Sequence, residues 1–188
     1  MKLPSMIKGW LNPQIDPERA LKSYASTGNS KYLTLLVEHF NLSLYHYVLS
    51  QSDQELAEDI IQSVWLKVMH ATRSTNEHTN VKSWLFTIAR NTLIDELRRQ
   101  QRWQWQELSE HYLSHEPVEQ VVSEADRLTQ FNYAITQLSF YQREAFIFQQ
   151  EGFSVLEICQ LTNESYETIK SRLRYARNNI KSLLGTQA

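Results

Sequence analysis

The 188-residue sequence contains few of the residues that interrupt helices, with four glycines and four prolines. Hydrophobic residues make up 41% of the chain and aromatic residues 11%, which argues against disorder. A glycine-rich loop of the kind that holds phosphates is absent, so that class of nucleotide site is excluded. The composition is typical of a globular, mostly helical protein.

Cys159 is the one cysteine of the sequence, which excludes an internal disulfide and fits the reducing environment of the cytoplasm. Its apolar neighbours favour a small buried side chain over a redox switch. Apolar runs long enough to cross a membrane are also missing, and residues 1–11 make a poor signal peptide. We therefore expect a cytoplasmic protein with no segment inserted in a membrane.

Groups of side chains able to catalyse a reaction or hold a metal are missing as well. His111 and His115 have the spacing of two ligands on one helix face, but no third ligand accompanies them. The motifs Glu-x-x-His and His-Glu-x-x-His, typical of helical di-metal sites and zinc proteases, do not occur. The sequence therefore predicts a protein that is not an enzyme and that needs neither a metal nor another cofactor.

Positive charge is not in excess, because 19 Lys and Arg stand against 21 Asp and Glu, a formal net charge of −2. Affinity for nucleic acid would have to come from local clusters of basic residues. One such cluster is the run from Arg98 to Arg102, and another lies in the C-terminal segment. Residues 103–126 have the opposite character, with six acidic residues and no Lys or Arg.

Residues 154–184 have the pattern of two helices joined by a tight turn. Ser154 and Glu157 have the spacing of a capping box at the start of the first helix. Asn163 lies in the break, where a left-handed conformation is tolerated. Ser165 is the expected cap of the second helix, and four apolar residues form one side of that helix: Ile169, Leu173, Ala176 and Ile180.

The second helix of this pair is strongly cationic. After Ser165 it has one acidic residue, Glu167, and five basic ones: Lys170, Arg172, Arg174, Arg177 and Lys181. A solvated surface helix in a bundle usually interleaves both signs, so the excess of one sign favours contact with DNA. The segment is predicted to be a helix-turn-helix whose second helix enters the major groove.

Helical spacing also runs through most of the remaining chain. Four helices are predicted before residue 103, over 16–28, 30–50, 52–72 and 81–101, the third opened by a capping box from Ser52 to Glu55. Helical spacing resumes near Val118, and a helix over 141–150 precedes the helix-turn-helix. The sequence thus predicts an all-α fold with two small helical domains, 16–102 and 118–188. An N-terminal arm (1–15) and an acidic linker (103–117) complete the chain.

Several motifs, in this order, resemble those of bacterial RNA polymerase sigma factors of the sigma-70 family, in the extracytoplasmic-function (ECF) group. The stretch LAEDIIQSVWLKVM resembles the core-binding helix of sigma region 2, and VKSWLFTIARNTLIDELRRQQR resembles the promoter-reading helix that follows. Residues 138–177 resemble region 4. The turn departs from the family pattern, because Thr162, Asn163 and Glu164 replace a turn that is normally more apolar and contains glycine.

The resemblance implies a subunit without catalytic activity that binds core RNA polymerase and directs it to promoter DNA. Three residues on one helix face match the core-binding positions: Asp59, Gln62 and Leu66. Seven residues match positions that contact the −10 element: Asn76, His78 and Asn80 at bases, and Arg90, Asn91, Arg98 and Arg99 at the strand. By analogy with the family we also expect an anti-sigma factor as a partner.

The same resemblance implies contacts of the second domain with the −35 element. Lys170, Ser171, Arg174 and Tyr175 match base-contacting positions, while Arg172 and Arg177 flank them and suit phosphates. Two other classes stay open: a regulator that binds duplex DNA without polymerase, and an enzyme with a DNA-binding appendage. The basic run in the first domain and the linker without Lys or Arg argue against the regulator, and the absent catalytic groups argue against the enzyme.

Overall fold

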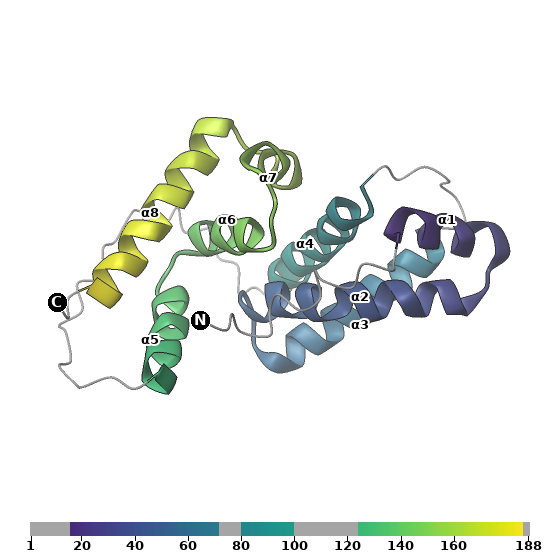
Figure 1. Ribbon diagram of the computed structural model, residues 1–188, viewed down its shortest axis with the longest axis horizontal. Coiled ribbons are helices and arrows are strands. Elements are labelled where there is room, and N and C mark those ends of the chain that lie inside the picture. The colour runs from purple at the N-terminus through teal and green to yellow at the C-terminus, as the bar shows by residue number, and fades with distance from the viewer. Residues whose placement is uncertain (1–15, 72–79, 100–123, 186–188) are drawn as a thin grey trace. The chain divides into compact units, whose positions relative to one another are not determined.

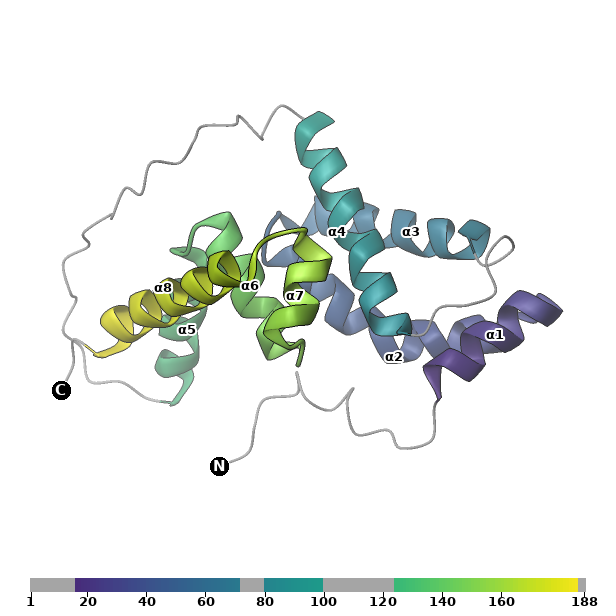
Figure 2. The ribbon, with the colours of Figure 1, turned by 90° about the horizontal axis from the view of Figure 1, so that it is seen from above.

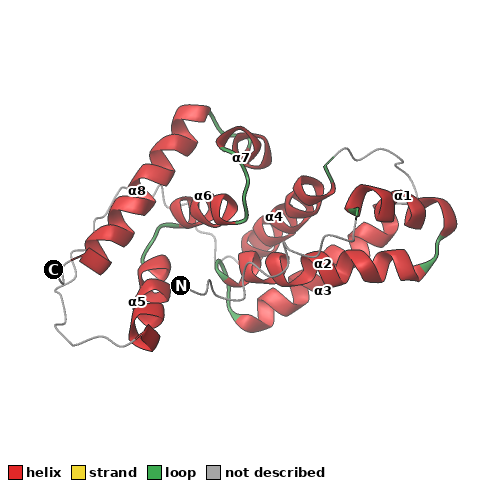
Figure 3. Cartoon of the chain, viewed as in Figure 1, coloured by secondary structure: helices red, strands yellow, loops and turns green. Residues whose placement is uncertain are grey.

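The computed structural model describes residues 16–71, 80–99 and 124–185, and within them the chain forms eight α-helices and no strand (Figures 1 and 3). The helices separate into two compact units, Met1–Arg102 with α1–α4 and Trp103–Ala188 with α5–α8. The predicted all-α fold with two helical domains is confirmed. The predicted arm (1–15) and acidic linker (103–117) lie outside the described residues.

The first helix, α1 (Pro17–Thr27), begins and ends where the sequence predicts. The Asp16 side chain accepts a hydrogen bond from the amide of Arg19 at 2.9 Å, and a proline occupies the first turn. Gly28 ends the helix with a φ angle of 66°, a left-handed conformation that glycine adopts without steric cost.

Three longer helices complete the first unit: α2 (Ser30–Leu49), α3 (Gln54–Ala71) and α4 (Val81–Arg99). α2 packs against the other three helices, and Figure 2 shows α4 crossing it. The fully buried rings of Tyr47 and Phe86 meet between α2 and α4 with their centroids 5.8 Å apart. Burial of each such side chain contributes about 1.5–3 kcal/mol, so this contact helps to fix α4 on α2.

The predicted capping box from Ser52 to Glu55 is wrong in its register. Asp53 caps α3, because its carboxylate accepts a hydrogen bond from the amide of Leu56 at 3.0 Å. The hydroxyl of Ser52 instead donates to the carbonyl oxygen of Val48 at the end of α2, at 2.9 Å. Ser and Asp are equally good caps, so local sequence alone does not decide between them.

The second unit contains α5 (Glu124–Thr136), α6 (Phe140–Gln150), α7 (Val155–Thr162) and α8 (Tyr166–Gly185). α8 packs against each of the other three helices. One cluster of buried residues packs α5 and α6 against α8: Ala134, Leu138, Phe146, Ala176 and Ile180. Fully buried Phe148 meets Phe153 edge to face, at a centroid distance of 5.8 Å, just before α7 begins. The core therefore holds α8 along its length.

The rotation of α3 about its own axis depends on a polar contact with α2. The indole N–H of Trp65, whose side chain is buried, donates to Oδ1 of Asn41 at 2.8 Å. A buried donor without an acceptor is costly, so this bond favours the orientation in which Trp65 faces α2. The buried side of α3, which includes Ala57, Val64 and Val68, leaves the side opposite these residues exposed.

We predict that Asn41→Ala lowers the free energy of unfolding of the protein by about 1–3 kcal/mol, because the buried indole N–H loses its acceptor. Urea denaturation of both variants followed by circular dichroism measures this. Leu42→Ala, at the neighbouring exposed position, is the control and should change the free energy by no more than about 0.5 kcal/mol. Equal midpoints for wild type and Asn41→Ala would contradict the assignment.

Candidate functional site

The exposed side of α3 carries the three residues predicted to bind polymerase. Asp59, Gln62 and Leu66 are all exposed, and they follow one another at spacings of three and four residues. The Leu66 side chain is 53% exposed, so its apolar surface is available to a partner. The structure therefore brings together a carboxylate, an amide and an apolar side chain on one accessible helix face.

The N-terminus of α4 is held by two side chains. Oδ1 of Asn80 accepts from the amide of Ser83 at 2.9 Å, and Oε1 of Glu18 in α1 accepts from the amide of Val81 at 3.2 Å. The carbonyl oxygen of Asn80 thus caps the helix, and its predicted contact with a base stays a prediction. The other two predicted base contacts, Asn76 and His78, lie outside the described residues.

Four polar residues of α4 were predicted to contact the −10 strand. Asn91, Arg98 and Arg99 are exposed, and Arg90 is half-buried. Asn91 and Arg98 are seven residues apart and so share one helix face. Arg99 lies at the helix end and pairs with Glu96 at 2.9 Å. The basic end of α4 is accessible, and a cation at a helix C-terminus is favoured by the helix dipole.

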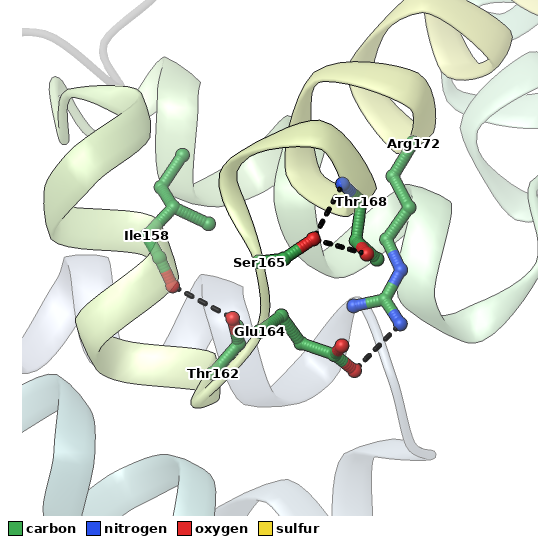
Figure 4. A network of polar contacts seen from close by, with 6 residues as sticks. All are labelled: Ile158, Thr162, Glu164, Ser165, Thr168 and Arg172. Atoms are coloured by element: carbon green, nitrogen blue, oxygen red, sulfur yellow. Dashed lines mark hydrogen bonds and ion pairs between the residues drawn. The ribbon is translucent and has the colours of Figure 1, made fainter.

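The turn between α7 and α8 is built as the sequence predicts. Ser154 and Glu157 form the capping box, with the Ser154 amide donating to Glu157 at 2.8 Å. Asn163 has a φ angle of 57° and ends α7 in the left-handed conformation. The hydroxyl of Ser165 accepts from the amide of Thr168 at 3.1 Å and so caps α8 (Figure 4). Three residues thus connect the two helices, as in a helix-turn-helix.

The two sides of α8 differ sharply in chemistry. Its buried side is formed by Ile169, Leu173, Ala176 and Ile180, as predicted. Four predicted base contacts occupy the other side: Lys170 and Arg174 are exposed, and Ser171 and Tyr175 are half-buried. The guanidinium of Arg174 lies 5.1 Å from the ring centre of Tyr175. This side therefore presents two cations, a hydroxyl and an aromatic ring together.

Arg172 was predicted to contact a phosphate, and the structure gives it a different place. Its Nη2 lies 2.7 Å from Oε1 of Glu164, and its guanidinium lies 4.5 Å from the ring centre of Tyr141 in α6. Its side chain is only 17% exposed. Position 172 lies about 200° around the helix from both Lys170 and Arg174, so it turns toward the protein when they face solvent.

Arg177, the other predicted phosphate contact, is exposed on the side of α8 nearest to the end of α6. Its Nη2 donates to Oε1 of Gln149 at 2.6 Å. Because this bond is at the surface and joins a charged group to a neutral amide, it leaves the positive charge available to an anion. Arg177 is therefore accessible to a phosphate, whereas Arg172 is held against Glu164 and Tyr141.

The described residues contain no group of three or more His, Cys, Asp and Glu side chains that could hold a metal ion. His111 and His115, the pair singled out in the sequence, lie outside these residues. Cys159, which was predicted to be buried, is partly exposed. Within residues 16–71, 80–99 and 124–185, no helix has the length and apolar character needed to cross a membrane.

Two family profiles match the chain, one in each unit. The profile described as Sigma-70 region 2 matches residues 36–103, and the profile described as Sigma-70, region 4 matches residues 128–180. The first range holds α3 and α4 with the exposed face of α3, and the second holds the helix-turn-helix. These matches define the class of protein, a two-domain sigma factor of the sigma-70 type.

Similar proteins and a similar solved structure show which group of sigma factors the chain resembles. The chain is 29% identical over 147 residues to the ECF RNA polymerase sigma factor EcfG of Rhodopseudomonas palustris, covering 76% of this chain and 79% of that protein. It is 24% identical over 132 residues to the RNA polymerase sigma factor YlaC of Bacillus subtilis, covering 68% and 76%. The sigma factor RpoE of Bartonella quintana, solved with the anti-sigma factor NepR, matches with a TM-score of 0.64 and 28% identity, covering 84% of this chain and 99% of that one.

The chain therefore belongs to the sigma-70 family of RNA polymerase sigma factors, in the ECF group. Membership of this family assigns the protein to promoter-directed initiation of transcription, which confirms the function predicted from the sequence. The residues that perform each step do not follow from membership alone.

We predict that Asn80→Ala lowers the free energy of unfolding by about 0.5–2 kcal/mol, because α4 loses an N-cap. Asn80→Asp keeps an oxygen acceptor and adds a negative charge near the helix N-terminus, so it should be at least as stable as wild type. Thermal unfolding of the three proteins tests both statements. A melting temperature that is unchanged in Asn80→Ala would contradict the capping role.

Proposed function

We propose that the two helical units act on different partners during initiation. The first predicted domain, residues 16–102, binds core RNA polymerase through α3 and the −10 element through the end of α4. The second predicted domain, residues 118–188, binds the −35 element through α8, and residues 103–117 connect the two domains. The observation that carries this proposal is the side of α8 opposite its buried face, where Lys170, Ser171, Arg174 and Tyr175 gather.

The proposed role of α8 follows from its size and its side chains. An α-helix with its side chains is about 10–12 Å wide and fits the major groove, which is about 12 Å wide. Arg174 can donate two hydrogen bonds to a guanine edge, and Lys170 and Ser171 can reach neighbouring bases. Arg177, next to this group and exposed, is suited to a phosphate.

The proposed polymerase contact is the exposed face of α3. Asp59 offers a carboxylate, Gln62 an amide and Leu66 an apolar anchor, all from one face. A basic, rod-like partner complements this combination, and the family resemblance identifies that partner as the clamp helices of the largest polymerase subunit. The exposure of Leu66 supports the proposal, because burying it against a partner removes apolar surface from water.

The proposed −10 contacts are divided between the residues before α4 and the end of α4. Asn76 and His78 are assigned to a base that has left the stack, and Asn80 is assigned to the helix cap. Arg90, Asn91, Arg98 and Arg99 are assigned to the backbone of the strand. The exposure of three of these four supports the assignment.

Three further properties belong to this proposal. The protein is a subunit without catalytic activity, it works in the cytoplasm, and an anti-sigma factor controls it. The solved complex of the related Bartonella quintana sigma factor with the anti-sigma factor NepR supports a partner of that kind. An exposed face with a large apolar residue, such as that of α3, suits a competing protein partner as well as polymerase.

We predict that Asp59→Ala weakens binding to core polymerase by about tenfold, equivalent to about 1.4 kcal/mol, without lowering the stability of the isolated protein. The exposed carboxylate takes part in no buried network, so its loss should be felt in the complex. Fluorescence anisotropy of labelled protein titrated with core polymerase measures the affinity. Glu38→Ala, which removes an exposed acid from α2, is the control. Equal affinities for wild type and Asp59→Ala would remove Asp59 from the interface.

We predict that Arg174→Ala costs about 1–3 kcal/mol of discrimination between promoters with an intact and a mutated −35 element, as expected for a lost bidentate base contact. The measurement is the ratio of the holoenzyme's affinities for the two promoters. The control is Arg177→Ala, which should weaken binding to both promoters alike. It should also reduce the slope of log binding constant against log salt concentration by about 1. If Arg174→Ala also weakens both promoters alike, Arg174 contacts phosphate and not a base.

A further inference from the structure

Arg172, which the sequence predicts to contact the −35 element, is directed toward the rest of the protein. Its side chain forms an ion pair with Glu164 in the turn (Figure 4). Its guanidinium also lies over the ring of Tyr141 in α6. Glu164 is two residues before α8 begins, and Arg172 is nearly two turns into it. The ion pair therefore ties the turn to the middle of the helix, and the ring contact ties both to α6.

The contact is well suited to holding a fixed geometry. The guanidinium is planar, so it can stack on the ring of Tyr141 while its Nη2 bonds to Glu164 at 2.7 Å. The two charged side chains are 17% and 33% exposed, which screens their attraction less than at an open surface. A lysine has no planar group to stack and would not reproduce this arrangement.

Release of Arg172 to a phosphate would leave an unfavourable arrangement. Glu164 would lose its cationic partner in a half-buried position, beside a helix that faces the negative backbone of DNA. In addition, Nη1 of Arg172 is buried and has no hydrogen-bond partner among the residues that the structure describes. A buried side chain of this kind is poorly placed to reach a phosphate.

We propose that Arg172 is a positioning residue for −35 recognition. Through Glu164 and Tyr141 it sets the orientation of the N-terminal half of α8, from which Lys170, Ser171, Arg174 and Tyr175 project. Readout of base edges requires side chains placed within about 0.5 Å and 10–20° of their productive geometry, so a helix that is free to tilt reads bases poorly. The inference rests on the proposed function of α8.

The deciding variant is Glu164→Ala, because the two roles of Arg172 predict opposite results for it. If Arg172 is a positioning residue, loss of Glu164 loosens α8 and weakens binding to an intact −35 element by about five- to tenfold. If Arg172 is a phosphate contact, loss of Glu164 frees the guanidinium and removes a negative charge, so binding stays the same or tightens. Glu164 is in the turn, so its removal leaves the core untouched.

The experiment compares holoenzymes carrying wild type, Glu164→Ala, Arg172→Ala and the double variant on promoters with intact and mutated −35 elements. We expect both single variants to lose affinity mainly on the intact promoter, and the double variant to be no weaker than Arg172→Ala. Non-additivity is expected because both substitutions remove the same contact. The dependence of promoter affinity on salt concentration should stay as in wild type. Loss of a phosphate contact would instead lower the slope of log affinity against log salt concentration by about 1.

Glu167→Ala is the matched control, because it removes an exposed acid from the first turn of α8. It should not weaken binding to the intact promoter, which separates the effect of the ion pair from that of charge. Thermal unfolding of each variant is recorded. If Arg172→Ala does not unfold cooperatively, the promoter affinity of Glu164→Ala alone distinguishes the two roles of Arg172.

The proposal is overturned if Glu164→Ala binds the intact promoter as tightly as wild type or more tightly. It is also overturned if both promoters weaken equally, since that result reports only a smaller folded fraction. Failure of the proposed function is distinguishable, because wild-type holoenzyme would then bind both promoters alike before any substitution is made.

Discussion

Burial of one side of α8 is the constraint on which the rest of the second unit depends. Ile169, Leu173, Ala176 and Ile180 repeat at helical spacing and are covered by α5, α6 and α7. Since each residue advances the helix by about 100°, a register shift of one residue would rotate Lys170 and Arg174 out of their exposed position. The apolar residues therefore determine which side chains can meet DNA, although none of them would touch it.

In the first unit, burial of one side of α3 likewise determines which residues are exposed on the other side. The buried residues of α3, such as Ala57, Val64 and Val68, leave Asp59, Gln62 and Leu66 exposed on the opposite side. The chain has a net charge of −2, so its attraction to DNA cannot come from overall charge. Cations are instead concentrated at the end of α4 and along α8, while the exposed face of α3 carries a carboxylate, an amide and an apolar side chain. Packing thus separates the surfaces that we propose for two chemically different partners.

Much of the fold could be predicted from the sequence because it depends on residues that are close in the chain. The cap at Asp16, the end at Gly28, the capping box at Ser154 and the left-handed Asn163 all arise from neighbours within four residues. The buried side of α8 follows from spacing alone. For the candidate site, helical spacing was also enough to predict that Asp59, Gln62 and Leu66 share one face of α3. It likewise predicted that the proposed base contacts lie on the side of α8 away from its buried residues.

Other details could not be predicted, because one residue or two neighbours can serve several roles and local sequence does not decide among them. Ser52 and Asp53 are both good caps, and Asn80 suits both a cap and a base. Arg172 meets Tyr141, 31 positions earlier in the sequence, so its environment depends on how α6 packs on α8. Its position three residues after Ile169 and four before Ala176 was nevertheless a signal that it borders the buried side.

We propose that the two cationic surfaces bind promoter DNA specifically only when polymerase binds the first unit and both surfaces reach the same promoter. The most direct test is a gel shift on a cognate promoter fragment, with the purified chain alone and with the chain plus core polymerase at equal concentrations. We expect a promoter-specific, competitor-resistant complex with polymerase and none with the chain alone. A promoter-specific complex that is equally tight without polymerase would contradict the account and favour an independent DNA-binding regulator.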